Sequence, residues 1–178
     1  FYKSQVNPSY LSAIEYARIL RSIGDISSII DVGCGRGSWL KAFKEIFSLE
    51  TSSILGIDGD WNSINDLILD CNYLSFDLEK VDQLQLQHRY DLAISLEVAE
   101  HIPSSSSKDF VAALCNQADL IIFSSANSLQ GGIGHINESR PSYWANLFSE
   151  HEFVTFDFFR PKLWGNVNVK WWYQQNTF

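Results

Sequence analysis

Methionine is absent from this chain of 178 residues, and cysteine is scarce. Without methionine the chain has no initiator residue, so we expect a fragment or a processed form from which an N-terminal piece is missing. The three cysteines, Cys34, Cys71 and Cys115, are odd in number and form no C-x-x-C pair. This pattern excludes a disulfide framework and favours buried thiols in a reducing, cytoplasmic setting.

Long apolar runs and an excess of basic charge are also missing. No apolar stretch approaches the roughly 20 residues that a membrane span requires, and no signal peptide is visible. Only 13 Lys and Arg stand against 21 Asp and Glu, and a net charge of -8 argues against a broad nucleic-acid footprint. We therefore expect one cytoplasmic domain whose partner is a small molecule rather than a nucleic acid, and no membrane association. The sequence indicates no oligomeric state.

Strand and helix patterns alternate along most of the chain. Apolar runs predict strands at 26–32, 53–58, 73–77, 90–96 and 119–125. Helical periodicity predicts helices at 8–21, 38–47, 61–70, 81–87, 104–116 and 141–150. This alternation is typical of a parallel sheet covered on both faces. Two more predicted strands, at 153–159 and 169–178, have no helix between them, which predicts an antiparallel hairpin at the sheet edge.

Three glycines at alternate positions follow the first predicted strand. Gly33, Gly35 and Gly37 let the backbone approach a ligand closely, and the next helix presents free N–H groups to it. The dinucleotide fingerprint Gly-x-Gly-x-x-Gly fits only in part, because Ser38 occupies its final position. Asp31, just before the glycines, opposes a pyrophosphate ligand and suits an ammonium group. The pattern therefore opposes a nicotinamide oxidoreductase.

Acidic residues also end the next three predicted strands. They are Asp58, Asp77 and Glu97. Ligands of open α/β sheets lie outside the carboxyl ends of the strands, where these side chains gather. Asp58 lies about as far beyond the glycines as a ribose-binding carboxylate needs. The strand ends therefore predict a ligand site.

A second group of chemically active residues follows the fourth predicted strand. Glu97, Glu100 and His101 lie within five positions, and His135 lies in a glycine-rich loop after the fifth strand. Carboxylates and imidazoles suit Mg²⁺, Mn²⁺ or Zn²⁺. His135 is the best candidate general base, because imidazole titrates near neutrality, and His101 is the second. The alternative is a hydrogen-bonded histidine beside helix-capping acids, without metal.

The glycine segment and the strand-end acids resemble motif I and its surroundings in the class I S-adenosyl-L-methionine (SAM)-dependent methyltransferases. The resemblance implies an α/β, Rossmann-like, doubly wound, mostly parallel seven-stranded sheet with a C-terminal antiparallel hairpin. It implies SAM as cofactor, with Asp58 on the ribose, Asp77 and Leu78 at the adenine, and Trp61 on the adenine face. The methionine portion would lie at Asp31 and the glycine turn. The implied cofactor-binding residues are Asp31, Gly33, Gly35, Gly37, Asp58, Trp61, Asp77, Leu78 and Glu97.

One methyltransferase domain is expected over 1–178, with a helical cap at 1–25, a cofactor-binding core at 26–125 and a substrate-side loop, helix and hairpin at 126–178. The expected reaction is methylation of a small-molecule acceptor on O, or on N or C, in secondary or glycan metabolism. His135 and His101 are the expected catalytic residues.

Two alternatives remain open. The E-x-x-E-H pattern with a distal histidine resembles the metal site of the small-RNA methyltransferases. It also resembles the E-V-x-E-H segment of ubiquinone-pathway O-methyltransferases. A metal-dependent RNA 3′-end 2′-O-methyltransferase is therefore the first alternative, with Glu97, Glu100, His101 and His135 as ligands of a divalent metal. A non-catalytic SAM-fold binding module is the second.

Overall fold

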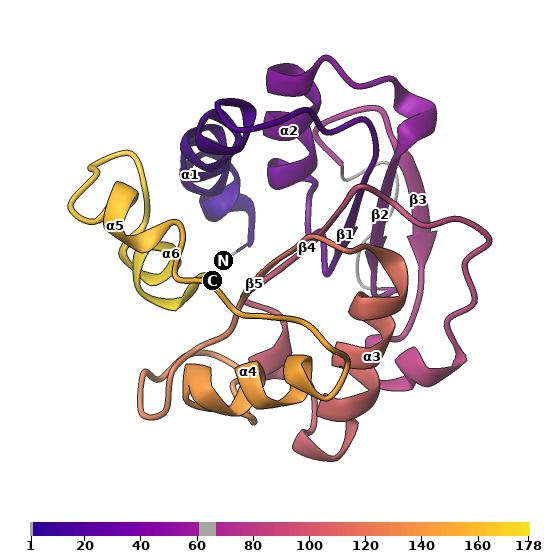
Figure 1. Cartoon of the computed structure of the whole chain (residues 1–178), viewed down its shortest axis with the longest axis vertical. Helices are drawn as coiled ribbons and strands as arrows, with labels where there is room; N and C mark the ends of the chain where they lie inside the picture. The colour runs from indigo at the N-terminus through magenta and orange to yellow at the C-terminus, as the bar shows by residue number, and fades with distance from the viewer. Residues whose placement is uncertain (1, 61–66) are drawn as a thin grey trace.

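The computed structural model describes residues 2–60 and 67–178, and within them five strands form one sheet in the order β3-β2-β1-β4-β5 (Figure 1). Every pair of neighbouring strands is parallel. The strands are β1 (Ile29–Val32), β2 (Ile54–Asp58), β3 (Asn72–Ser75), β4 (Leu92–Leu96) and β5 (Ile121–Ser124). Each overlaps a strand predicted from the sequence, so the α/β class and the parallel sheet are confirmed.

Helices cover both faces of the sheet, as the apolar strands require. α1 (Tyr2–Arg21) and α2 (Ser38–Phe47) lie on one face, and α3 (Ser107–Gln117) and α4 (Pro141–Ser149) on the other (Figure 1). The shorter helices are η1 (Thr51–Ser53), η3 (Leu78–Gln83), η4 (Ala99–His101), η5 (Ser104–Ser106), α5 (Arg160–Leu163) and α6 (Trp171–Asn176). The predicted helix 61–70 lies largely outside the described residues, and 67–70 are not helical.

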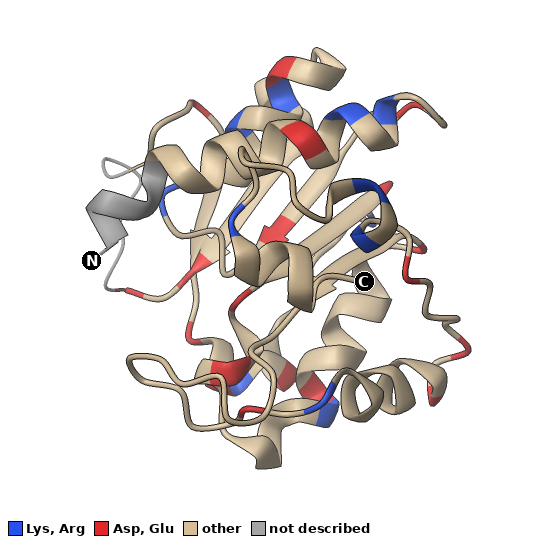
Figure 2. Ribbon diagram, turned by 90° about the vertical axis from the view of Figure 1, so that its left-hand side faces the viewer, with Lys and Arg blue, Asp and Glu red and all other residues tan. Residues whose placement is uncertain are grey.

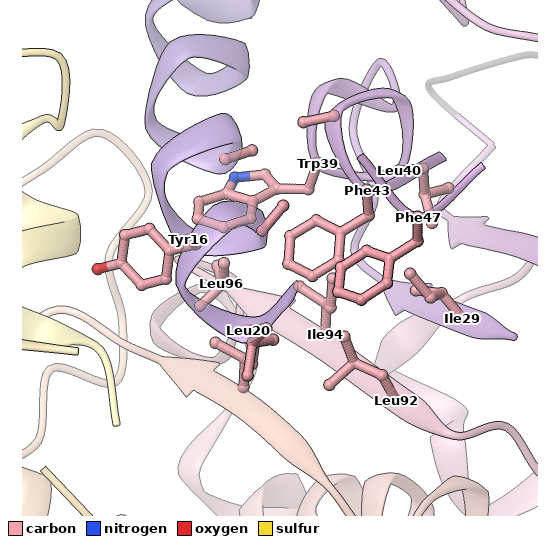
Figure 3. Packing of buried hydrophobic residues seen from close by; sticks show 14 of the residues in the cluster. Tyr16, Leu20, Ile29, Trp39, Leu40, Phe43, Phe47, Leu92, Ile94 and Leu96 are labelled. Atoms are coloured by element: carbon pink, nitrogen blue, oxygen red, sulfur yellow. The ribbon is translucent and has the colours of Figure 1, made fainter. Parts of the chain in front are cut away.

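Aromatic side chains fill the layer between α1, α2 and the sheet. Tyr16, Trp39 and Phe43 are buried there, above Leu92 and Ile94 of β4 (Figure 3). The Tyr16 and Trp39 rings meet edge to face, with centroids 5.1 Å apart, a favoured aromatic geometry. This packing fixes α2, and therefore the turn that leads into it, against the sheet.

The predicted antiparallel hairpin and seven-stranded sheet are wrong. Residues 153–158 form no strand, and the predicted strand 169–178 contains the helix α6. One antiparallel feature remains, because Phe178 and Phe123 exchange two backbone hydrogen bonds of 3.0 and 2.9 Å beside β5. The described sheet is otherwise entirely parallel.

Tertiary packing explains why the aromatic run at 171–173 is helical although such residues favour strands. Tyr173 is buried against α1, where its carbonyl accepts a hydrogen bond from the Tyr16 hydroxyl at 2.9 Å. Its ring meets Trp39 edge to face at 5.0 Å. The side chains of this run therefore do not alternate between two faces, as those of the predicted strand would. Trp171 is 55% exposed, whereas Tyr173 is 7% exposed.

The direction of chain crossing reverses between β1 and β4. From β1 the chain passes to β2 and β3 on one side, and it then returns to β4 and β5 on the other. Such a switch point opens a crevice outside the carboxyl ends of the two strands. The glycine turn follows β1 and the Glu97–His101 segment follows β4, so both motifs lie at this crevice. Among the described helices, none is long and apolar enough to cross a membrane.

Candidate functional site

The glycine turn after β1 depends on backbone conformations that favour glycine. Gly33, Gly35 and Gly37 have φ of 86°, 55° and 79°. The N–H groups of Gly33 and Cys34 both donate to the carbonyl of Ile57, at 2.8 and 3.0 Å. A Cβ on Gly33 would collide with the Val98 side chain. The turn is therefore closed against β2 on one side and against the segment after β4 on the other.

Two buried carboxylates lie beneath this turn. Asp58 accepts hydrogen bonds from the N–H of Gly35 at 2.6 Å and from that of Gly59 at 2.7 Å. Asp31 is 3% exposed, and its Oδ2 has no hydrogen-bond partner in the described part of the chain. Burial and then the nearby Asp58 raise the pKa of Asp31. An unpartnered buried oxygen is costly, so it suits a donor that a ligand supplies.

The first of two cavities at the crevice, here called the β2-side cavity, has a volume of about 540 Å³. Its walls come from the glycine turn and from the ends of β2, β3 and β4, and they include Asp58, Asp77, Leu78 and Glu97. Asp77 lies at its rim, accepts the Glu79 N–H at 3.1 Å and pairs with Lys80 at 2.8 Å. This pairing lowers the pKa of Asp77.

Two of the predicted cofactor residues that the structure describes lie away from this cavity's walls. Asp31 is beneath the turn, and Gly37 lies farther along the turn, where it precedes α2. Trp61 falls outside the described residues, so its prediction is not addressed by the structure.

Glu97 ends β4 in a left-handed conformation, with φ of 58°, and its side chain is held by two other segments. The Ser124 hydroxyl donates to Oε1 at 2.7 Å. Asn176 Nδ2 lies 3.1 and 3.2 Å from the two carboxylate oxygens. Burial raises the pKa of Glu97, and the bonds from Ser124 and Asn176 oppose that rise. The sequence carried no signal for Asn176, which comes from α6.

Glu100, His101 and His135 converge beside Glu97. One ligand atom from each lies within 4.8 Å of the others. Glu100 is completely buried, and neither of its carboxylate oxygens has a hydrogen-bond partner among residues 2–60 and 67–178. Burial, followed by the charge of Glu97, raises the pKa of Glu100 to about 8. The predicted metal set of four residues is thus gathered only in part, since Glu97 is bonded to Ser124 and Asn176 instead.

The two imidazoles are oriented by hydrogen bonds at Nδ1. His135 Nδ1 lies 2.8 Å from Glu138 Oε1, and His101 Nδ1 lies 3.1 Å from the Gly134 carbonyl. Each ring then has Nε2 left for a ligand. The bond to His135 lowers the pKa of Glu138, while burial lowers the pKa of His101. The sequence placed Glu138 three positions from His135 without revealing this bond.

The second cavity, here called the α6-side cavity, has a volume of about 370 Å³. Its walls include Glu100 and His135, together with Trp171 and Trp172 of α6. It shares wall residues with the β2-side cavity, and these are Gly33, Gly35, Glu97 and His101. The two cavities therefore meet at the glycine turn and the end of β4.

The described Lys and Arg residues are scattered in the view of Figure 2, where they lie in separate small groups among more numerous Asp and Glu. Among these described residues, the arrangement does not resemble the basic face that a nucleic-acid backbone requires.

Comparison with known proteins assigns the fold to a family. A family described as methyltransferase domain matches residues 2–174. The chain belongs to this family. It is therefore a SAM-dependent methyltransferase, as the sequence predicted, and SAM is the methyl donor that family membership implies. No curated protein sequence matches the chain.

Solved structures with the same fold are distant in sequence. Magnesium protoporphyrin IX methyltransferase from Synechocystis, with bound S-adenosylhomocysteine (SAH), is 17% identical at a TM-score of 0.66, covering 86% of this chain and 78% of that one. A SAM-dependent methyltransferase from Archaeoglobus fulgidus is 18% identical at a TM-score of 0.63, and the match covers 82% of this chain and 69% of that one. A small-RNA methyltransferase is 20% identical at a TM-score of 0.62, and the match covers 78% of this chain but 20% of that much longer one. These likenesses confirm the Rossmann-like methyltransferase fold.

Proposed function

We propose that this methyltransferase transfers a methyl group from SAM to a hydroxyl group of a small-molecule acceptor. The observation that carries the proposal is the 2.8 Å contact between His135 Nδ1 and Glu138. It orients an imidazole in a cavity that adjoins the β2-side cavity. A base is needed for a hydroxyl acceptor, whereas an amine can react by positioning alone.

The β2-side cavity is our candidate for the adenosine part of SAM. Asp58, which ends β2 in the wall of this cavity, would accept hydrogen bonds from the ribose hydroxyls. Asp77 and Leu78 at the rim would meet the adenine. The methionine part would cross the glycine turn toward Glu97, with its ammonium group drawn to the acidic turn region where Asp31 Oδ2 is unpartnered.

The α6-side cavity is our candidate for the acceptor. SAM supplies a methyl group already activated by its sulfonium, so the protein mainly aligns the reactants and excludes water. His135 Nε2 would take the proton of the acceptor hydroxyl while Nδ1–H donates to Glu138. The carboxylate stabilises the imidazolium that forms and fixes the ring orientation.

A divalent metal is a second candidate for the same task, favoured by the convergence of Glu100, His101 and His135. Glu100 offers a carboxylate without a protein partner, and both histidines are held at Nδ1 by second residues, as metal-bound imidazoles commonly are. A metal there would lower the pKa of a bound hydroxyl. The scattered basic charge does not favour RNA as the acceptor. The cytoplasmic location stays a prediction.

Transfer of labelled methyl from SAM to hydroxylated small molecules tests the proposal, with mass spectrometry to locate the new methyl group. We expect a methyl ether, and about a hundredfold loss of rate in His135→Gln. His151→Gln is the matched control, because this histidine lies outside the cluster. Methylation only of amines, or an unchanged rate in His135→Gln, would contradict the role of His135.

Binding of Mn²⁺, followed by its electron paramagnetic resonance signal, tests the metal candidate. The protein is first treated with EDTA and then titrated with MnCl₂. We expect saturable binding that is lost in Glu100→Gln and kept in His151→Gln. Equal binding by both variants would show that the ion lies elsewhere.

A further inference from the structure

The hydrogen-bonding groups that line the α6-side cavity differ in whether the protein already bonds them. Those without a described protein partner are the Glu100 carboxylate, Nε2 of His101 and His135, and Nε1 of Trp39. The first three converge, whereas among the other lining groups the Ser9 hydroxyl is already bonded to Tyr173 at 3.2 Å. The Gln130 side-chain oxygen accepts the Asn127 N–H, also at 3.2 Å. Arg36 is engaged by an interaction within the protein.

Another part of the lining is apolar and aromatic. The indoles of Trp171 and Trp172 lie edge to face with centroids 5.7 Å apart. Trp171 is 55% exposed and Ile133 is 79% exposed although both line the cavity, so they form its rim. Exposed large apolar side chains gathered at a cavity mouth are typical of a binding site for apolar surface.

From the convergence of Glu100, His101 and His135 and the exposed aromatic rim of the same cavity, we propose that the acceptor is a hydroxylated aromatic compound. Its hydroxyl would lie at His135 and its flat body against Trp171, Trp172 and Ile133. This inference rests on the proposed function, since it names the acceptor of that reaction. An aromatic ring gains stacking and apolar burial at the indoles. A sugar would bury several hydroxyls against the same surfaces without partners, and each unpaired hydroxyl costs free energy.

The size of the cavity agrees with a small, flat acceptor. A volume of about 370 Å³ lies near the lower end of the range for small-molecule sites, about 300–1,000 Å³. His101 and Glu97 line both cavities, so the hydroxyl-binding part of the α6-side cavity adjoins the cofactor side. A phenol that enters past Trp171 thus presents its oxygen where the two cavities meet.

Saturation-transfer NMR with two probes tests the inference. β-Naphthol carries one hydroxyl on an aromatic body, and methyl glucoside carries several on a non-aromatic ring. We expect binding of β-naphthol and no measurable binding of methyl glucoside. Trp171→Ala is expected to weaken β-naphthol binding about tenfold. Trp164→Ala is the matched control, because this indole is 68% exposed and does not line the cavity.

The outcomes separate the inference from the function on which it rests. Preferential binding of methyl glucoside, or equal losses in the two tryptophan variants, would overturn the aromatic acceptor. SAH is titrated into the same samples as an independent reading. Binding of SAH with no binding of β-naphthol would refute the inference and leave methyl transfer standing, whereas failure of SAH to bind would refute the proposed cofactor site.

Discussion

The two cavities at the crevice are built by different means. The β2-side cavity is shaped by backbone: glycines with positive φ, and Asp58, whose oxygens are held by two N–H groups. The α6-side cavity is shaped by side chains from distant segments, with Glu100 left without a protein partner. The first is thus fixed locally by the sheet, while the second depends on a loop and a C-terminal helix. Substitutions in the two cavities should therefore have separable effects.

The largest expected effect is that of Gly33→Ala on the glycine turn, where the two cavities meet. The new Cβ would collide with Val98, and the φ of 86° is strained for any residue with a side chain. We expect SAH affinity to fall about a hundredfold or more, measured by calorimetry. Gly24→Ala is the control, because its Cβ meets nothing within 4 Å. Equal affinities in the two variants would show that the turn does not shape the cofactor site.

Glu138→Gln should give the next largest effect, and only on the acceptor side. Without the carboxylate, the His135 ring loses the partner that orients it and stabilises its charged form. We expect the rate of methyl transfer to a phenol to fall about tenfold or more, with SAH affinity unchanged. Glu150→Gln, on an exposed acid outside both cavities, is the control. A parallel loss of SAH affinity would mean that the two cavities are not separable.

Gly132→Ala tests how closely the loop holds the proposed base. Its Cβ would meet the imidazole of His135, so this ring would have to leave the position in which Glu138 holds it. Because a side chain rather than backbone must move, we expect a loss of transfer rate of about tenfold. The melting temperature should change little. A large loss of thermal stability without a change in rate would contradict this view of the loop.

The residues around the β2-side cavity were easier to predict from the sequence than those around the α6-side cavity. Asp31, Gly33 and Asp58 lie at strand ends within short stretches of chain, so periodicity and glycine chemistry were enough to place them. The bond between Asn176 and Glu97 joins residues far apart in the chain, and no local pattern marks it. The aromatic run at 171–173 was predicted as a strand because its intrinsic preference is extended, but packing of Tyr173 on Tyr16 and Trp39 favours a helix.

The smallest expected effect concerns the pH dependence of stability on the acceptor side. The pKa of Glu100 is raised from 4.5 to about 8 in the folded state, so folding favours its protonated form. The contribution of protonated Glu100 to folding stability is fully present below its unfolded pKa of 4.5. It is lost as the pH rises through its folded pKa of about 8. In EDTA, Glu100→Gln should therefore gain melting temperature relative to the parent between about pH 5 and pH 9. A difference that does not vary with pH would contradict this.

Calorimetric titration with SAH, comparing Asp58→Asn with His135→Gln, tests the separation of the two cavities most directly. The two residues lie in the walls of different cavities, and neither lines both. We predict that Asp58→Asn loses about tenfold or more in SAH affinity, while His135→Gln binds SAH like the parent protein. Loss of SAH affinity in His135→Gln with full affinity in Asp58→Asn would contradict the assignment of cofactor and acceptor to these cavities.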